Sequence, residues 1–221
     1  MDACLIQSEV ALAAVAARLR SATHLAIAVH PCGEDPPWSD AQQLVVKAAD
    51  GEVVVVVDLT ATDGLGALGA VLEQTLVVGH DLRPTLALLN RHGVEPRSVW
   101  DTMLAARLLD GGLHLDAAKR GRYFGFDEVA RREINESFDA TAADLGGAVR
   151  RIGTLLDLHA RLVERVATDQ LAGAMALELD VLPVVVAMTL AGVGVDRARW
   201  QALVTSRRDE ATLLRDRSSR S

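Results

Sequence analysis

Residues 77–109, VVGHDLRPTLALLNRHGVEPRSVWDTMLAARLL, decide the fold. The short apolar run 75–78 is typical of a central strand, and Gly-His-Asp follows it directly. Apolar residues at helical spacing then predict a helix over 84–92, and Asp101-Thr-Met predicts the start of a second helix that ends near Leu109. A strand followed by two helices of this kind predicts helices that pack on the face of a sheet.

Three more strands are expected before this stretch. Residues 25–29 form an apolar run that is typical of a buried strand. The β-branched runs 44–48 and 53–59 flank Asp50-Gly51, a pair suited to the positive φ angles of a tight hairpin turn. We therefore expect three antiparallel strands at the start of a mixed sheet.

Helices dominate the rest of the chain. Gly192 and Gly194 are typical of a helix end, and they predict a break between the last two helices. The pattern predicts an α/β fold over residues 1–170, a mixed sheet flanked by helices, followed by C-terminal helices over 171–221. The expected helices span 10–19, the segment from Leu65 to the central strand, 142–170, 171–190 and 197–217.

The composition is that of a folded protein, with 221 residues, 50% hydrophobic and 24% charged. Aromatic residues make up 3% of the chain, so platforms for base stacking are few. Two cysteines, Cys4 and Cys32, provide no disulfide framework and no zinc-ligand spacing. We expect no segment that approaches the roughly 20 apolar residues needed to span a bilayer, and no signal peptide. These features favour a cytoplasmic protein without a membrane partner.

The net charge of −7 is concentrated in residues 1–80, which carry 3 Lys and Arg against 10 Asp and Glu. Residues 81–221 carry 20 of each, so a surface that binds phosphate is expected there. Solvated helix faces are the alternative interpretation of the same charges. The candidate nucleic-acid-binding residues are Lys119, Arg120, Arg122, Arg131, Arg132, Arg150 and Arg151.

Three motifs resemble the 3′-5′ exonuclease (proofreading, DEDD-type) domain of family A, or DNA polymerase I-like, DNA polymerases. Residues 178–196, ELDVLPVVVAMTLAGVGVD, resemble the helical segment that leads into the polymerase domain. Residues 101–109 and 79–89 resemble two motifs of the exonuclease domain itself. The resemblance implies an RNase H-like fold over 1–170, and single-stranded or primer-end DNA and a polymerase domain as partners.

Exonucleases of this family hold two divalent metals, about 4 Å apart, with four carboxylates. The resemblance places these acids, and the residues that anchor them, at positions where this chain has mostly other residues. Because a guanidinium about 4 Å from a divalent metal is repelled by roughly 8 kcal/mol at an effective dielectric near 20, no ordinary two-metal site is expected. The matched positions are Ala28 and His30 in the first motif, Asp81 and Thr85 in the second, and Gly147 and Arg151 in the third.

The sequence thus predicts a degenerate, catalytically inactive domain, without a metal cofactor, that serves as a scaffold or contacts nucleic acid in DNA replication or repair. One alternative is an active exonuclease, dependent on Mg or Mn, whose rearranged site uses Asp81, Asp101, Glu34 or Asp35. Asp101 is better interpreted as a helix N-cap. The other alternative is a protein-interaction module that binds its partner through the helices after Leu171.

Overall fold

The computed structural model describes residues 3–30, 43–111, 116–138 and 144–218. Glu34 and Asp35, two acids of the rearranged-site alternative, lie outside the described residues. The chain divides into two compact units, Met1–Ala187 and Met188–Ser221. The first unit contains the sheet and its flanking helices. The predicted boundary between residues 170 and 171 stays a prediction.

A six-stranded mixed sheet forms the centre of the first unit, in the order β1-β4-β3-β2-β5-β6. Strands β2, β3 and β4 are antiparallel neighbours, as predicted. The outer pairs are parallel: β1 with β4, β2 with β5, and β5 with β6. The strands are β1 (Ala3–Ile6), β2 (His24–His30), β3 (Gln43–Ala48), β4 (Val54–Asp58), β5 (Leu76–Gly79) and β6 (Val99–Asp101).

The turn between β3 and β4 differs from the prediction. Neither Asp50 nor Gly51 has a positive φ, so the expected tight hairpin is wrong. The Gly51 amide instead donates to the Ala48 carbonyl at 3.2 Å, and residues 49–53 form a longer connection. A longer loop relieves the need for the left-handed backbone that a two-residue turn requires.

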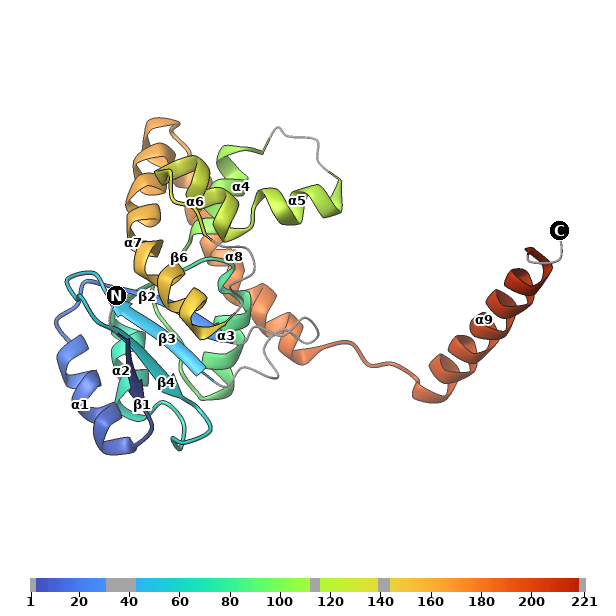
Figure 1. Cartoon of the computed structure of the whole chain (residues 1–221), viewed down its shortest axis with the longest axis horizontal. Helices are drawn as coiled ribbons and strands as arrows, with labels where there is room; N and C mark the ends of the chain where they lie inside the picture. Colours follow the sequence, from blue (N-terminus) through green and yellow to red (C-terminus); the bar gives the residue numbers. More distant parts are fainter. Residues whose placement is uncertain (1–2, 31–42, 112–115, 139–143, 219–221) are drawn as a thin grey trace. The chain divides into compact units, whose positions relative to one another are not determined.

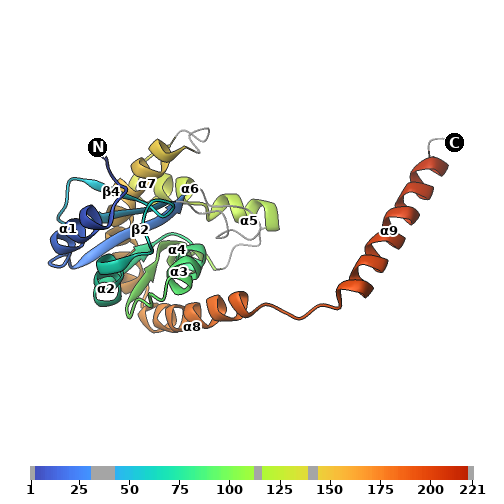
Figure 2. The ribbon, with the colours of Figure 1, turned by 90° about the horizontal axis from the view of Figure 1, so that it is seen from below.

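Helices cover both faces of the sheet, with α1, α2 and α3 on one side and α7 on the other (Figures 1 and 2). Alternate residues of the strands face α7, and Ala26, Val56 and Val78 there contact Ile152 and Leu155. A second core joins α4, α6, α7 and the start of α8. These helices are α1 (Glu9–Leu19), α2 (Gly66–Gln74), α3 (Leu82–Arg91), α4 (Thr102–Leu109), α5 (Ala117–Tyr123), α6 (Phe126–Ile134), α7 (Leu145–Thr168) and α8 (Ala172–Ala191).

Helix α8 overturns one expectation. Its 20 residues make it long and apolar enough to cross a membrane, by length and composition only. Glu178 and Asp180 interrupt the run of apolar residues in the sequence, but the helix as a whole remains apolar. One such helix is weak evidence for a membrane span, because the core helix of a soluble protein passes the same test. Its Met175 and Leu182 are buried, so one face of α8 packs on protein.

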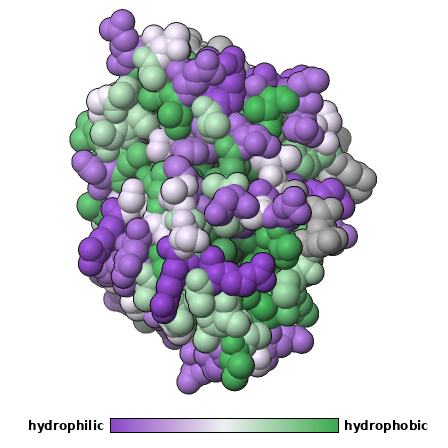
Figure 3. All heavy atoms as spheres, turned by 90° about the vertical axis from the view of Figure 1, so that its left-hand side faces the viewer, coloured by the Kyte–Doolittle hydropathy of each residue, from purple (hydrophilic) through white to green (hydrophobic). Residues whose placement is uncertain are grey.

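The second unit contains the end of α8 and helix α9 (Arg197–Ser218). Gly192 has a φ of 66° and follows the last residue of α8, as the predicted helix stop requires. No described side chain of α9 is buried. Figure 3 draws one face of the molecule, on which hydrophilic and hydrophobic residues are interspersed.

Candidate functional site

Strand β2 and helix α7 enclose a cavity of about 440 Å³, here called the sheet pocket. Ala28 and His30 lie on the same face of β2 as the buried Ala26, because side chains of a strand alternate between faces. Arg151 reaches this pocket from α7, and His80 reaches it from the turn after β5. The structure therefore brings together Ala28, His30 and Arg151, from the first and third motif positions of the sequence.

A second cavity of about 500 Å³, here called the arginine pocket, adjoins the first. Phe126 and Arg151 line both cavities, which makes them the boundary between the two. The residues of the arginine pocket with large side chains or charge include Arg122, Phe126, Asp127, Arg131, Phe138 and Arg151.

The Arg151 guanidinium is held by Asp127 of α6. Its Nε donates to Asp127 Oδ1 at 2.7 Å, and one terminal nitrogen donates to Oδ2 at 2.9 Å. The hydrogen bonds that Arg151 donates to Asp127 raise the pKa of Arg151, so the guanidinium is charged at every physiological pH. Arg151, at the position matched to the third motif, therefore places a fixed positive charge between the two pockets.

His30 contributes little positive charge to the sheet pocket. Burial lowers the pKa of His30, and the charge of Asp144 only partly opposes this effect. The imidazole is therefore mainly neutral at pH 7. Asp144 itself caps α7, because its Oδ1 accepts from the Gly147 amide at 2.8 Å.

His80 connects three elements beside the sheet pocket. Its Nε2 lies 2.9 Å from the carbonyl oxygen of Phe124, which can only accept, so Nε2 carries the proton of the neutral ring. Its Nδ1 lies 2.8 Å from Thr102 Oγ1, whose single proton is shared between Nδ1 and the Gly79 carbonyl. Burial lowers the pKa of His80 to about 4. A neutral His80 thus fixes the β5 turn against α4 and the end of α5.

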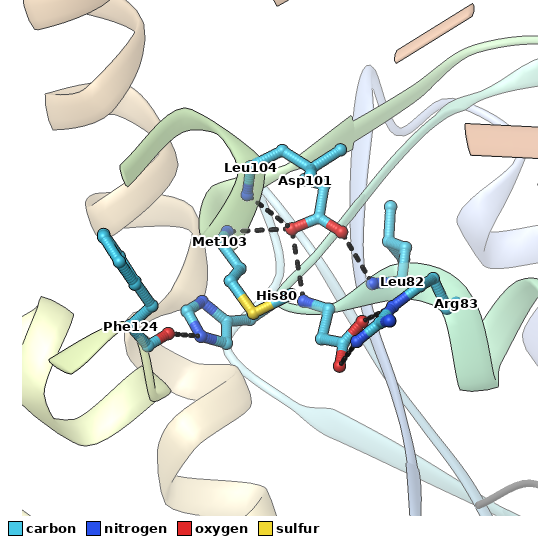
Figure 4. Close-up of polar contacts among 8 residues, drawn as sticks. His80, Leu82, Arg83, Asp101, Met103, Leu104 and Phe124 are labelled. Carbon is cyan, nitrogen blue, oxygen red and sulfur yellow. Dashed lines mark hydrogen bonds and ion pairs between the residues drawn. The ribbon is translucent and has the colours of Figure 1, made fainter. Parts of the chain in front are cut away.

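Asp101 is fully buried and stabilises two helix N-termini at once (Figure 4). Its carboxylate accepts from the amides of Met103 and Leu104 in α4, at 2.8 and 3.3 Å, which confirms the predicted N-cap. It also accepts from the Leu82 amide of α3 at 2.7 Å, a contact that the sequence did not reveal. Burial raises the pKa of Asp101, and the amide donors oppose that shift.

The Asp81 carboxylate forms an ion pair with the neighbouring Arg83. Both of its carboxylate oxygens accept from Arg83, at 2.6 and 2.7 Å. Its φ of 52° is left-handed, a conformation that Asp and Asn adopt more readily than other residues with a Cβ. Neither Asp81 nor Asp101 lines the sheet pocket or the arginine pocket.

The remaining motif positions lie apart from the two pockets. Thr85 is buried within α3, with 4% of its surface exposed, and Gly147 is buried in the first turn of α7. Among the described residues, no group of three or more His, Cys, Asp or Glu is arranged to hold a metal ion. A methyl group, a neutral imidazole and a guanidinium do not fit the carboxylate-rich coordination that two divalent metals require.

The predicted basic residues do not all lie at one site. Arg122, Arg131 and Arg151 line the arginine pocket. Lys119 and Arg132 instead form ion pairs with Asp116 and Asp110, both at 3.0 Å. Arg150 is exposed and lines neither cavity, and the side chain of Arg120 lies outside the part of the chain that the structure describes.

Three residues of the site were missed by sequence reasoning: Asp127, Phe126 and Phe138. A signal for the aromatic residues exists in the sequence, because the one Tyr and all three Phe residues lie within 123–138. The low aromatic content of the whole chain obscured this local concentration. The pairing of Asp127 with Arg151 depends on the packing of α6 against α7, which the sequence pattern did not predict.

Comparisons with known proteins agree with this architecture. Residues 5–147, more than half of the chain, match a family model described as 3′-5′ exonuclease, of the DNA polymerase A type. The matched segment includes the first two motifs and ends at Gly147, before Arg151. A search of curated proteins returned no match to this chain.

Solved structures with the same fold include Escherichia coli RNase D, an exoribonuclease involved in structured RNA processing, with a TM-score of 0.68 and 17% identity. That alignment covers 84% of this chain and 51% of RNase D, so the chain spans about half its length. Brucella melitensis NrnC bound to pGG aligns with a TM-score of 0.70 and 18% identity, over 87% of this chain and 95% of NrnC.

Pol1 from M. smegmatis, in complex with DNA primer-template and dNTP, aligns over 94% of this chain and 35% of Pol1. The TM-score is 0.70 and the identity is 24%. These likenesses confirm the predicted RNase H-like fold.

Proposed function

The chain belongs to the 3′-5′ exonuclease family of the DNA polymerase A type, and from that membership we propose that it is a degenerate exonuclease domain. In this proposal the domain no longer hydrolyses DNA. It remains as a nucleic-acid-contacting module or scaffold in DNA replication or repair, in the cytoplasm, and it requires no metal.

One observation carries the proposal: the Arg151 guanidinium lines the sheet pocket at the position where the family resemblance places a metal-binding carboxylate. Arg151 is fixed there by two hydrogen bonds to Asp127, so it does not swing away easily to admit a metal. Ala28 and His30 add no anionic ligand on the opposite side of the same pocket. A divalent cation would find no anionic ligand among the described residues that line this pocket, and the Arg151 guanidinium would oppose its binding.

Contact with nucleic acid is supported by two observations. Among the solved structures with the same fold, NrnC is bound to pGG, and Pol1 is bound to a DNA primer-template. In this chain, three arginines line a single pocket beside the cleft. A polymerase domain, in a longer parent protein or as a separate chain, is the proposed partner.

The rearranged exonuclease has less support from the geometry. Asp101 is fully buried and its oxygens are occupied by backbone amides, while Asp81 is occupied by Arg83. Neither faces the cleft, so the two acids would have to leave stable hydrogen bonds before they could bind a metal. Glu34 and Asp35 lie outside the described residues and add no geometric support.

The decisive test is release of the 3′ nucleotide from labelled single-stranded DNA, with Mg²⁺ and then Mn²⁺, and with a chelator as control. We expect no release by protein that circular dichroism shows to be folded. Release that the chelator abolishes would refute the inactive assignment, and an Asp81→Asn, Asp101→Asn double variant would then test the rearranged site.

The protein-interaction alternative draws on one observation, the exposed apolar side chains of Leu177, Val181 and Val184 on α8. It differs from the proposal in its salt dependence. Binding to nucleic acid weakens steeply as salt rises, because counterions are released when phosphates are neutralised. A domain that binds only protein would show no affinity for single-stranded DNA even at low salt.

A further inference from the structure

The arginine pocket combines two flat rings with positive charge. Phe126 and Phe138 lie 5.4 Å apart between ring centroids, and neither is fully buried. The Arg151 guanidinium lies 5.9 Å from the centroid of the Phe138 ring. A nucleobase can stack on such rings while its phosphate reaches the guanidinium, and each stacked base strengthens binding by roughly 5- to 140-fold in known complexes.

The charges of the pocket favour an anionic ligand. Three arginines, Arg122, Arg131 and Arg151, face two carboxylates, Asp127 and Glu128. Glu128 pairs with Arg131 at 2.6 Å, and Asp127 pairs with Arg151. Arg122 forms no ion pair within the part of the chain that the structure describes, and its side chain is exposed. Counted over the described residues that line it, the pocket carries one net positive charge, which Arg122 supplies.

The pair of Arg151 with Asp127 also shows how a ligand would be held. Asp127 accepts two parallel hydrogen bonds from the guanidinium, the same geometry that a phosphate accepts from arginine. Asp127 comes from the first turn of α6 and is partly exposed, so a phosphate can replace it without passing through the core. A cavity of about 500 Å³ is within the range that holds small ligands.

We propose that the arginine pocket binds an unpaired nucleotide of a single strand without a divalent metal, with the phosphate on Arg151 and Arg122 and the base against Phe126 and Phe138. The phosphate takes the place of Asp127 on the Arg151 guanidinium, and Arg122 supplies the net positive charge. This inference rests on the proposed function and specifies the ligand at that site. No covalent bond forms or breaks.

Binding is measured with the full chain in EDTA, by fluorescence anisotropy of a labelled oligothymidylate and by calorimetry with dAMP and with inorganic phosphate. We expect Arg122→Gln and Arg151→Gln each to weaken binding of the oligonucleotide and dAMP by about tenfold or more, the effect of losing a charged hydrogen bond. Phe138→Leu should weaken binding of dAMP several-fold and leave inorganic phosphate unchanged. Arg161→Gln, which removes an exposed arginine of α7 paired with Glu164, is the matched control and should leave all affinities unchanged.

Arg151→Gln removes the partner of Asp127, so its binding result is interpreted only when the variant keeps the melting temperature of the wild type. Arg122→Gln lies at an exposed position and tests the inference even when Arg151→Gln lowers the melting temperature. Binding that EDTA abolishes, or that Arg122→Gln leaves intact, overturns the inference. The proposed function fails separately, if the chain releases nucleotides in Mg²⁺ or Mn²⁺. Because dAMP has no bond that an exonuclease cleaves, the binding result stands whatever the outcome of the cleavage assay.

Discussion

At the scale of single residues, buried polar groups hold the turn after β5 in place. Asp101 satisfies amides from two helices, and His80 joins the same turn to Thr102 and Phe124. Gly79 permits this arrangement, because a Cβ at that position would lie 2.2 Å from the Leu82 side chain. Residues 79–82 therefore have a structural role: they fix the turn after β5, and this role does not depend on catalysis.

Two histidines, the partly buried His80 and the buried His159, predict a loss of stability in acid. Burial lowers the pKa of His80 to about 4, and burial, aided by the charge of His24, lowers the pKa of His159 to about 4. Both values lie below the ordinary 6.5, so the unfolded chain binds protons more readily than the folded chain. The stabilising contribution is complete above pH 6.5 and is lost as the pH falls towards 4.

We expect each histidine to remove on the order of 2–3 kcal/mol of unfolding free energy between pH 7 and pH 4.5. Urea unfolding at both pH values checks this for the wild type and for His80→Gln and His159→Gln. Each variant should lose less stability on acidification than the wild type does. An equal loss in all three proteins would show that carboxylates alone determine the acid response.

At the scale of elements, helix α8 has apolar side chains on two opposite faces. Met175, Leu182 and the partly buried Leu179 pack within the first unit, whereas Leu177 and Val181 are exposed. Residues two positions apart in a helix point in nearly opposite directions, so the two rows lie on opposite sides. A helix with apolar side chains on opposite faces is typical of the core of a large protein or of a membrane span.

Paired substitutions in α8 distinguish its two faces. Leu182→Ala should lower the unfolding free energy by about 2–4 kcal/mol, because Leu182 is 4% exposed and its removal leaves a cavity. Leu177→Ala removes the same atoms from a side chain that is 65% exposed, and should change stability by less than about 0.5 kcal/mol. Chemical denaturation of both variants measures the difference. Equal effects would mean that the exposed face is covered in solution.

The central strands and most helices were predictable from the sequence, whereas β1, β6, α5 and α6 were not. The central strands and α1, α3, α4, α7, α8 and α9 were predicted to within a few residues, because apolar runs, helical spacing or the glycine break at Gly192 indicated them. Strands β1 and β6 have only 4 and 3 residues, too few for a period to be recognised. In the site, Ala28, His30 and Arg151 were expected together, but Asp127 depends on helix packing between distant segments and had no local signal.

At the scale of the whole molecule, the hydrophobic cores lie within the first unit. The buried residues of both core clusters fall between Ala26 and Met175. Helix α9 has no buried side chain among its described residues, and Trp200 and Leu203 are 57% and 49% exposed. The first unit therefore contains the packing needed for its own stability.

A chain shortened to residues 1–194 should fold with a melting temperature within about 2 °C of the full chain, since the removed side chains contribute little burial. Differential scanning calorimetry of both proteins checks this expectation. As a control, a chain shortened to residues 1–170 also loses the buried Met175 and Leu182 of α8 and should melt at a clearly lower temperature. A large drop for the 1–194 chain would show that α9 stabilises the rest.

In the proposed degenerate domain, the ion pair of Arg151 and Asp127 opposes a return of catalysis. Arg151→Asp alone would set a new carboxylate beside Asp127, and two close carboxylates without a cation repel each other. A first reverting mutation would therefore lower stability before any metal could be bound, because Ala28, His30 and Thr85 would still provide no ligands. Under the proposed function, a return of hydrolysis therefore requires several substitutions together, because a carboxylate at position 151 alone destabilises the domain.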